Sequence, residues 1–180
     1  MFNLKVNFIK RWLELDIDGL YFSDDWGTMQ GLMINPKLWR EYFKPYYQKM
    51  FNIVHKAGKH VFFHSDGKVQ DIIPDFIEMG GNAINVQVDL IGIDKLSKEF
   101  GGKICILADV DRQFILPFGT MDSVRDHIKH IIQSLAPFNG GLIAWGEIGP
   151  DVPLSNAEAM LQAFAEYGKY EKAQQHNFIK

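Results

Sequence analysis

The feature that most constrains the fold is a short apolar segment followed by polar side chains, a pattern that recurs along the chain. The segments span residues 18–23, 60–64, 82–86, 104–108 and 142–145. An apolar run of this length is typical of a strand covered on both faces. The intervening sequence is long enough for the helical crossovers that connect parallel strands. The pattern therefore predicts an α/β fold with a mainly parallel sheet.

Every one of these predicted strands runs into residues that can bind ligands or move protons. The residues in question are Asp24, Asp25 and Trp26; His64, Ser65 and Asp66; Gln87 and Asp89; Asp109, Asp111 and Arg112; and Gly146 with Glu147. In parallel α/β folds, the loops at the carboxyl ends of the strands form the active face. We therefore expect a binding or catalytic site along this edge of the sheet.

The pair formed by His64 and Asp66 stands out within this set. The two residues are two positions apart, so in an extended chain their side chains project to the same side. An imidazole and a carboxylate that converge at a strand end can bind a metal ion or transfer a proton. A His-x-Asp sequence is also common without such a role, and the residues alone leave both interpretations open.

Helices are predicted between the strands from apolar periodicity and capping residues. Asn35 before Pro36, and Thr120, have the residue types of helix N-caps, and Pro45 predicts a break within the second helix. Ser155 with Glu158 matches the capping-box pattern. The predicted helices span residues 4–16, 35–57, 68–79, 93–100, 121–136 and 155–170.

Composition limits the functional classes. The length of 180 residues predicts one domain spanning residues 1–180, and the net charge of -3 argues against nucleic acid or an anionic membrane as partner. We find no apolar run near the roughly 20 residues of a membrane span and no secretory signal, which predicts a cytoplasmic protein. The single cysteine, Cys105, excludes an internal disulfide and is expected to be a buried, inert thiol.

Four sequence motifs resemble those of the uroporphyrinogen decarboxylase family, which also contains the methylcobamide:coenzyme M methyltransferases and corrinoid-linked methyltransferases. The motifs span residues 24–28, 62–67, 116–120 and 146–153, and the resemblance extends over essentially the whole chain. It implies a (β/α)8 barrel of the TIM type. The chain would supply the carboxyl-terminal five β/α units, and thus an incomplete barrel.

The resemblance also implies a metal site. In the family's methyltransferases, a His-x-Cys pair and a later Cys hold a zinc ion that activates a thiol. His64 and Asp66 stand where that His and first Cys would be, and Glu147 stands near the later Cys. Carboxylates thus replace both sulfurs. A set of His64, Asp66 and Glu147 can still hold a divalent ion, with zinc as the first expectation and manganese or iron as alternatives.

The leading hypothesis is a corrinoid-linked methyltransferase in which this metal acts as a Lewis acid. A corrinoid would carry the methyl group, and the substrate would be a small molecule or a corrinoid protein. The expected catalytic carboxylates are Asp24, Asp25 and Asp66. The expected substrate-binding residues are Trp26, Gln30, Gln87, Asp109 and Asp111.

Two alternatives remain open from the sequence. The first is a metal-free uroporphyrinogen decarboxylase of porphyrin biosynthesis, which needs cationic groups for its acidic substrate, whereas the strand ends supply only Arg112. The second is a non-catalytic half-barrel that acts through self-association. Open strand edges predict a homodimer, or a partner that supplies the missing strands. Helices could not cover all of the apolar strand residues Phe22, Val61, Phe63, Ile84, Ile106 and Ile143, because some of them must point to the barrel interior.

Overall fold

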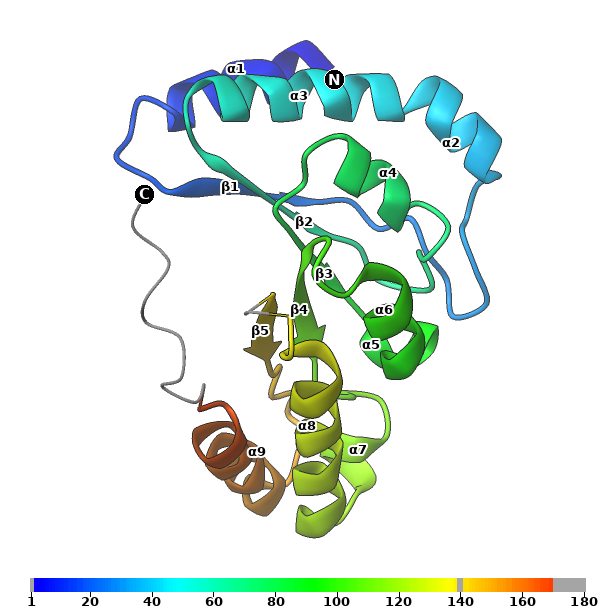
Figure 1. The fold of residues 1–180 in the computed structure, drawn as a ribbon, viewed down its shortest axis with the longest axis vertical. Helices are drawn as coiled ribbons and strands as arrows, with labels where there is room; N and C mark the ends of the chain where they lie inside the picture. The colour runs from blue at the N-terminus through cyan, green and yellow to red at the C-terminus, as the bar shows by residue number, and fades with distance from the viewer. Residues whose placement is uncertain (1, 139–140, 170–180) are drawn as a thin grey trace.

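The computed structural model describes residues 2–138 and 141–169, and its centre is one sheet of parallel strands (Figure 1). Each strand pairs with the strand that precedes it in the sequence, in the order β1-β2-β3-β4-β5. The strands are β1 (Gly19–Ser23), β2 (His60–His64), β3 (Ala83–Val86), β4 (Cys105–Asp109) and β5 (Leu142–Trp145). The predicted parallel α/β fold is confirmed.

Helices connect successive strands, as in consecutive β/α units of a TIM barrel. They are α1 (Phe2–Trp12), α2 (Pro36–Tyr42), α3 (Lys44–Lys56), α4 (Ile73–Glu78), α5 (Val88–Ile91), α6 (Ile93–Phe100), α7 (Ile115–Phe118), α8 (Met121–Leu135) and α9 (Leu154–Tyr167). In Figure 1 the helices line the convex side of the curved row of strands. Within residues 2–138 and 141–169, none of these helices is long and apolar enough to cross a lipid bilayer.

Local sequence explains most helix ends. The side chain of Asn35 accepts a hydrogen bond from the Lys37 amide, and that of Thr120 accepts one from the Ser123 amide, so both predicted N-caps are confirmed. The predicted break near Pro45 lies between α2 and α3. The predicted Ser155 cap is wrong. Helix α9 begins at Leu154, directly after Pro153, and has no side-chain cap.

The predicted helix over residues 68–79 is shorter than expected. Helix α4 begins at Ile73, with Pro74 in its first turn. Proline is favoured at this position because its fixed φ suits a first helical turn and its missing N–H has no partner there in any case. Residues 68–72 therefore remain part of the loop that follows β2, where they extend the segment next to the candidate site.

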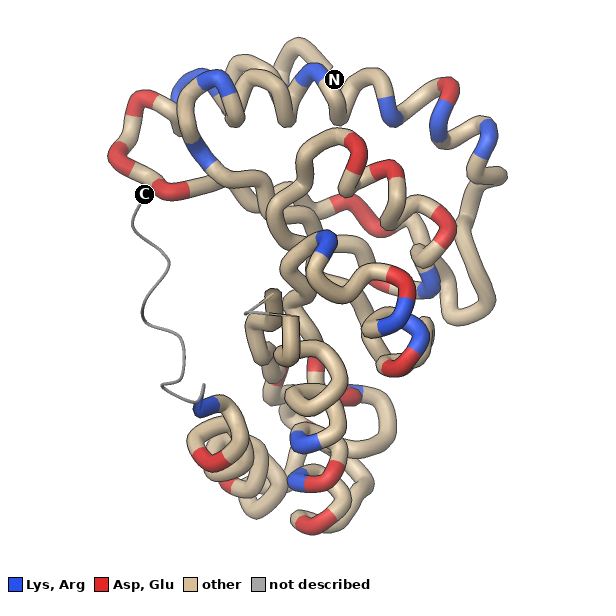
Figure 2. The backbone as a smooth tube through the Cα atoms, in the orientation of Figure 1, with Lys and Arg blue, Asp and Glu red and all other residues tan. Residues whose placement is uncertain are grey.

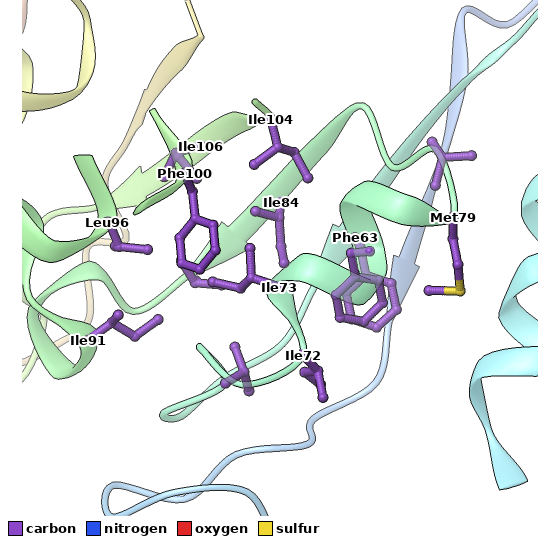
Figure 3. Close-up of a cluster of buried hydrophobic side chains, with 14 of the residues drawn as sticks. Phe63, Ile72, Ile73, Met79, Ile84, Ile91, Leu96, Phe100, Ile104 and Ile106 are labelled. Carbon is purple, nitrogen blue, oxygen red and sulfur yellow. The ribbon is translucent and has the colours of Figure 1, made fainter. Parts of the chain in front are cut away.

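The hydrophobic core lies between the sheet and the helices. The strand register aligns Phe63, Ile84 and Ile106 in one row on the helix-facing side, and all three are buried. Phe63 stacks on Phe76 of α4 with ring centroids 4.1 Å apart. Figure 3 shows this row packed against side chains from α4 and α6.

The opposite face of the sheet is open in the described part of the chain. Successive strand residues alternate between faces, so the row next to Phe63 consists of Ser23, His64, Asn85, Leu107 and Ile143. On this face Tyr21 is 52% exposed, Ile143 42% and Trp145 47%. The expectation that helices cannot cover all six apolar strand residues is confirmed by Ile143, which lies exposed on this face. Helices bury Val61, Phe63, Ile84 and Ile106, because these residues belong to the helix-facing rows.

Charged side chains lie on the helices and loops rather than on the sheet, as Figure 2 shows. Among the described strands, Asp109 is the only residue of the Lys, Arg, Asp and Glu types. Its position at the carboxyl end of β4 and its burial at 5% exposure are unusual for a carboxylate. The one charged residue of the described strands thus lies at the carboxyl edge of the sheet.

Candidate functional site

The loops that follow β1 and β2 are held together through their backbones. The Gly27 amide donates a hydrogen bond to the Asp66 carbonyl at 3.1 Å, and the Lys68 amide donates one to the Thr28 carbonyl at 2.8 Å. Gly67 has a φ of +81°, and a Cβ added there would overlap Gly27. A Cβ added at Gly27 would lie 2.7 Å from the Asp66 carbonyl oxygen. Two glycines therefore permit a contact that larger residues would prevent.

This contact brings Asp25 to the predicted His64–Asp66 pair. One ligand atom from each residue lies within 4.8 Å of the others. The Nε2 atom of His64 is 3.5 Å from Asp25 Oδ1 and 3.8 Å from Asp66 Oδ1. The Asp66 amide donates to Asp25 Oδ1 at 3.0 Å, which fixes that carboxylate. One imidazole nitrogen and two carboxylates are a donor set that suits zinc and leaves a fourth position open.

Glu147 lies outside this cluster and is linked to it through Arg112. The Arg112 guanidinium contacts Asp66 Oδ1 and Glu147 Oε2, each at 2.5 Å. Burial would lower the pKa of Arg112, but the hydrogen bond that it donates to Glu147 and the charge of Asp66 raise it above its usual value. The structure thus gathers Asp25, rather than the predicted Glu147, around His64 and Asp66.

Asp24 and Trp26 anchor the first loop. Asp24 forms an ion pair with Lys5 at 2.9 Å and accepts a hydrogen bond from the Tyr47 hydroxyl at 2.7 Å. The Trp26 indole N–H donates to the same hydroxyl, and the ring packs edge-on against Phe43. Burial, reinforced by the Asp24 carboxylate, raises the pKa of Tyr47 strongly. These contacts point to a structural role for two residues that were predicted to act on substrate.

The remaining predicted pocket residues have different surroundings. Gln87 accepts a hydrogen bond from the Gly67 amide at 2.8 Å, so it fixes the loop after β2. Asp111 caps the turn after β4, where its carboxylate accepts from the amides of Gln113 and Phe114. Gln30 lies in an exposed turn. Of these residues, Gln87 is the one whose side chain contacts the candidate site's loops.

Asn85 is a site neighbour that the sequence interpretation missed. It is 4% exposed, and its Oδ1 lies 2.6 Å from His64 Nδ1 while its Nδ2 donates to Asp109 Oδ1 at 2.6 Å. Burial raises the pKa of Asp109, although the Asn85 hydrogen bond and Arg112 oppose the change. The available signal was a single amide inside the otherwise apolar strand Ala83–Val86.

Comparisons with known proteins agree with this fold. A solved structure of a methyltransferase from Methanosarcina mazei superposes with a TM-score of 0.71 at 18% sequence identity, covering 93% of this chain and 48% of that chain. The chain thus spans about half the length of that methyltransferase. No curated protein sequence gives a significant match. The family model described as uroporphyrinogen decarboxylase (URO-D) matches residues 3–167, and the chain therefore belongs to the uroporphyrinogen decarboxylase family.

Proposed function

We propose that the chain forms part of a methyltransferase of this family that holds a divalent metal between Asp25, His64 and Asp66. The observation that carries the proposal is the convergence of three potential ligand atoms within 4.8 Å at the carboxyl edge of the sheet. The fold likeness to the Methanosarcina mazei methyltransferase supports the same reaction class. Zinc is the first candidate, because one nitrogen and two carboxylate oxygens are ligands that it commonly takes.

The residues around the cluster fit such a role. A bound ion would polarise a methyl donor or lower the pKa of an accepting nucleophile. His64 is held from one side by Asn85 and from another by Tyr21, whose ring stacks on the imidazole at 6.3 Å between centroids. The carboxylates of Asp25 and Asp66 are partly exposed, which leaves the cluster open to a substrate. A corrinoid, free or protein-bound, is the methyl carrier that we propose.

The decarboxylase alternative receives less support from the same geometry. A tetrapyrrole with acidic side chains needs free cationic groups in its pocket. Arg112, the cation that the sequence offers at the strand ends, is already bound to Asp66 and Glu147. A substrate carboxylate would have to displace both partners before it could bind there.

We further propose that the open face of the sheet is covered by additional β/α units. In the described residues, β1 and β5 each have one edge without a partner strand, and Tyr21, Ile143 and Trp145 are exposed beside them. Unpaired edges and exposed aromatic residues favour association. A second copy of the chain is the first candidate, and a partner with complementary strands is the second. Sedimentation of the isolated chain should show a dimer, whereas a stable monomer at tens of micromolar would contradict pairing with a second copy.

The metal proposal can be tested by titrating zinc into the chelator-treated chain. We expect binding near one zinc per chain, and a loss of affinity for Asp25→Asn that is greater than the loss for Glu147→Gln. The zinc-loaded chain, supplied with methylcobalamin and a thiol, should then produce demethylated cobalamin, followed by its absorbance spectrum. Equal affinities for wild type, Asp25→Asn and His64→Ala would overturn the metal site. Metal binding without methyl transfer to any of several thiols would overturn the proposed reaction.

A further inference from the structure

Asn85 occupies the centre of a hydrogen-bonded chain that runs along one face of the sheet from Asp109 to His64. Its Nδ2 donates to two acceptors, the Leu107 carbonyl at 2.9 Å and Asp109 Oδ1 at 2.6 Å. Its Oδ1 faces His64 Nδ1 at 2.6 Å and also accepts from the Tyr21 hydroxyl at 3.4 Å. The four partner groups of this amide come from strands β1, β2 and β4.

The orientation of the Asn85 amide follows from these partners. If the amide were turned over, its oxygen would face the Leu107 carbonyl, which can only accept. Two acceptors would then face each other in a buried place with no donor between them. The amide nitrogen therefore points to Leu107 and Asp109, and the oxygen points to His64.

The tautomer of His64 follows in turn. An amide oxygen can only accept, so the contact at 2.6 Å requires a proton on His64 Nδ1. In a neutral ring, Nε2 then carries the lone pair. That lone pair faces Asp25 Oδ1 at 3.5 Å and Asp66 Oδ1 at 3.8 Å. A metal ion placed between these three acceptors would take a ligand atom from each of them.

We infer that Asn85 is a positioning residue, whose amide holds the proton on Nδ1 of His64 and so presents Nε2 to a cation between Asp25 and Asp66. The inference rests on the proposed metal function and deepens it. Asp109 and the Leu107 carbonyl orient the amide, and Tyr21 adds a second donor to its oxygen. Neighbours of this kind typically change metal affinity ten- to a hundred-fold when they are removed.

The first measurement needs no variant. Long-range ¹⁵N–¹H correlation spectra of the metal-free, histidine-labelled chain at alkaline pH report which ring nitrogen of each histidine carries the proton. His64→Gln identifies the signals of His64 among the 6 histidines. We expect the Nδ1-protonated tautomer. A wild-type His64 protonated mainly on Nε2 would overturn the inference, even if zinc binds.

The second measurement compares two buried amides. Asn85→Leu should lower zinc affinity ten- to a hundred-fold and mix the His64 tautomers. Asn156→Leu is the matched control, because Asn156 is also buried at 3% exposure and donates its Nδ2 to two carbonyls, of Leu116 and Gly119. It should leave the zinc affinity and the His64 tautomer unchanged. Wild-type zinc affinity in Asn85→Leu would contradict the positioning role.

The two proposals can fail separately. A wild-type chain with the Nδ1-protonated His64 that binds no zinc would overturn the metal function and support the tautomer assignment. A chain that binds zinc with the other tautomer would support the metal function and overturn the role of Asn85. If Asn85→Leu does not fold, the wild-type spectrum still decides between these results.

Discussion

Replacement of Gly67 by alanine tests how the loops after β1 and β2 assemble the site. Gly67 has a φ of +81°, and an added Cβ would overlap the Gly27 backbone. The left-handed conformation costs a non-glycine residue about 1–2 kcal/mol, and forced overpacking costs about 1–3 kcal/mol more. We therefore expect Gly67→Ala to lower the free energy of unfolding by about 2–5 kcal/mol.

Two control variants separate these contributions. Gly58 has a φ of +70°, but its added Cβ would meet no atom within 4 Å, so Gly58→Ala should cost only about 1–2 kcal/mol. Gly27 has no positive φ, and its added Cβ would lie 2.7 Å from the Asp66 carbonyl oxygen. Gly27→Ala should therefore show the overlap cost of about 1–3 kcal/mol alone. Alanine also lowers the conformational entropy of the unfolded chain relative to glycine. This effect is common to all three variants and cancels when their free energies of unfolding are compared.

Urea unfolding followed by circular dichroism measures the stabilities, and zinc titration measures the site. Since the loop contact brings Asp25 to His64 and Asp66, Gly67→Ala and Gly27→Ala should also weaken zinc binding, whereas Gly58→Ala should not. If Gly67→Ala were as mild as Gly58→Ala in both measurements, the two loops would not be in contact and the reasoning would be refuted.

Three further predictions concern the charged residues near the site. Arg112→Gln should tighten zinc binding about tenfold, or about 1.4 kcal/mol, because Asp66 Oδ1 would be released from the guanidinium. Calorimetry measures the affinity, and weaker zinc binding in the variant would contradict the prediction. Asp24→Ala should lower the free energy of unfolding by about 1–2 kcal/mol, because the ion pair with Lys5 and the hydrogen bond from Tyr47 are lost. It should change the zinc affinity less than Asp25→Ala does. Burial raises the pKa of Asp109, so its carboxyl group stays protonated in the native state at pH values above the unfolded pKa of about 3.9. The stability that the protonated carboxyl group contributes is lost as the pH rises through the folded pKa. Asp109→Asn should therefore gain stability relative to wild type between pH 4 and pH 7 in urea titrations, and a constant difference would contradict this.

Much of the fold could be predicted from local patterns. The apolar segments around Phe62 and Ile106 are strands because their length and composition suit a covered sheet, and their parallel pairing follows from the helical crossovers. The side chains of His64 and Asp66 were expected on the same side because side chains alternate between the two sides of an extended chain. The start of α4 was missed because apolar periodicity continues through residues 69–72, whereas Pro74 determines where the helix begins.

The composition of the candidate site depended on contacts between loops, which spacing alone does not give. Asp25 approaches His64 because Gly27 and Gly67 allow two backbones to touch, and neither glycine differs in sequence from an ordinary turn residue. Glu147 follows the last strand as expected, but Arg112 from the preceding loop lies between it and Asp66. Asn85 was overlooked because a single amide in an apolar strand indicates a buried hydrogen bond without identifying its partner.

The most direct test of the central claim is the metal content of the purified 180-residue chain and of two histidine variants. His64→Ala removes the imidazole of the proposed site, and His60→Ala removes one at the opposite end of the same strand, where the residue is exposed. Elemental analysis after equilibration with zinc should find about one zinc per chain in wild type and in His60→Ala, and little in His64→Ala. Equal zinc content in all three, or none in wild type, would contradict a metal centre at Asp25, His64 and Asp66.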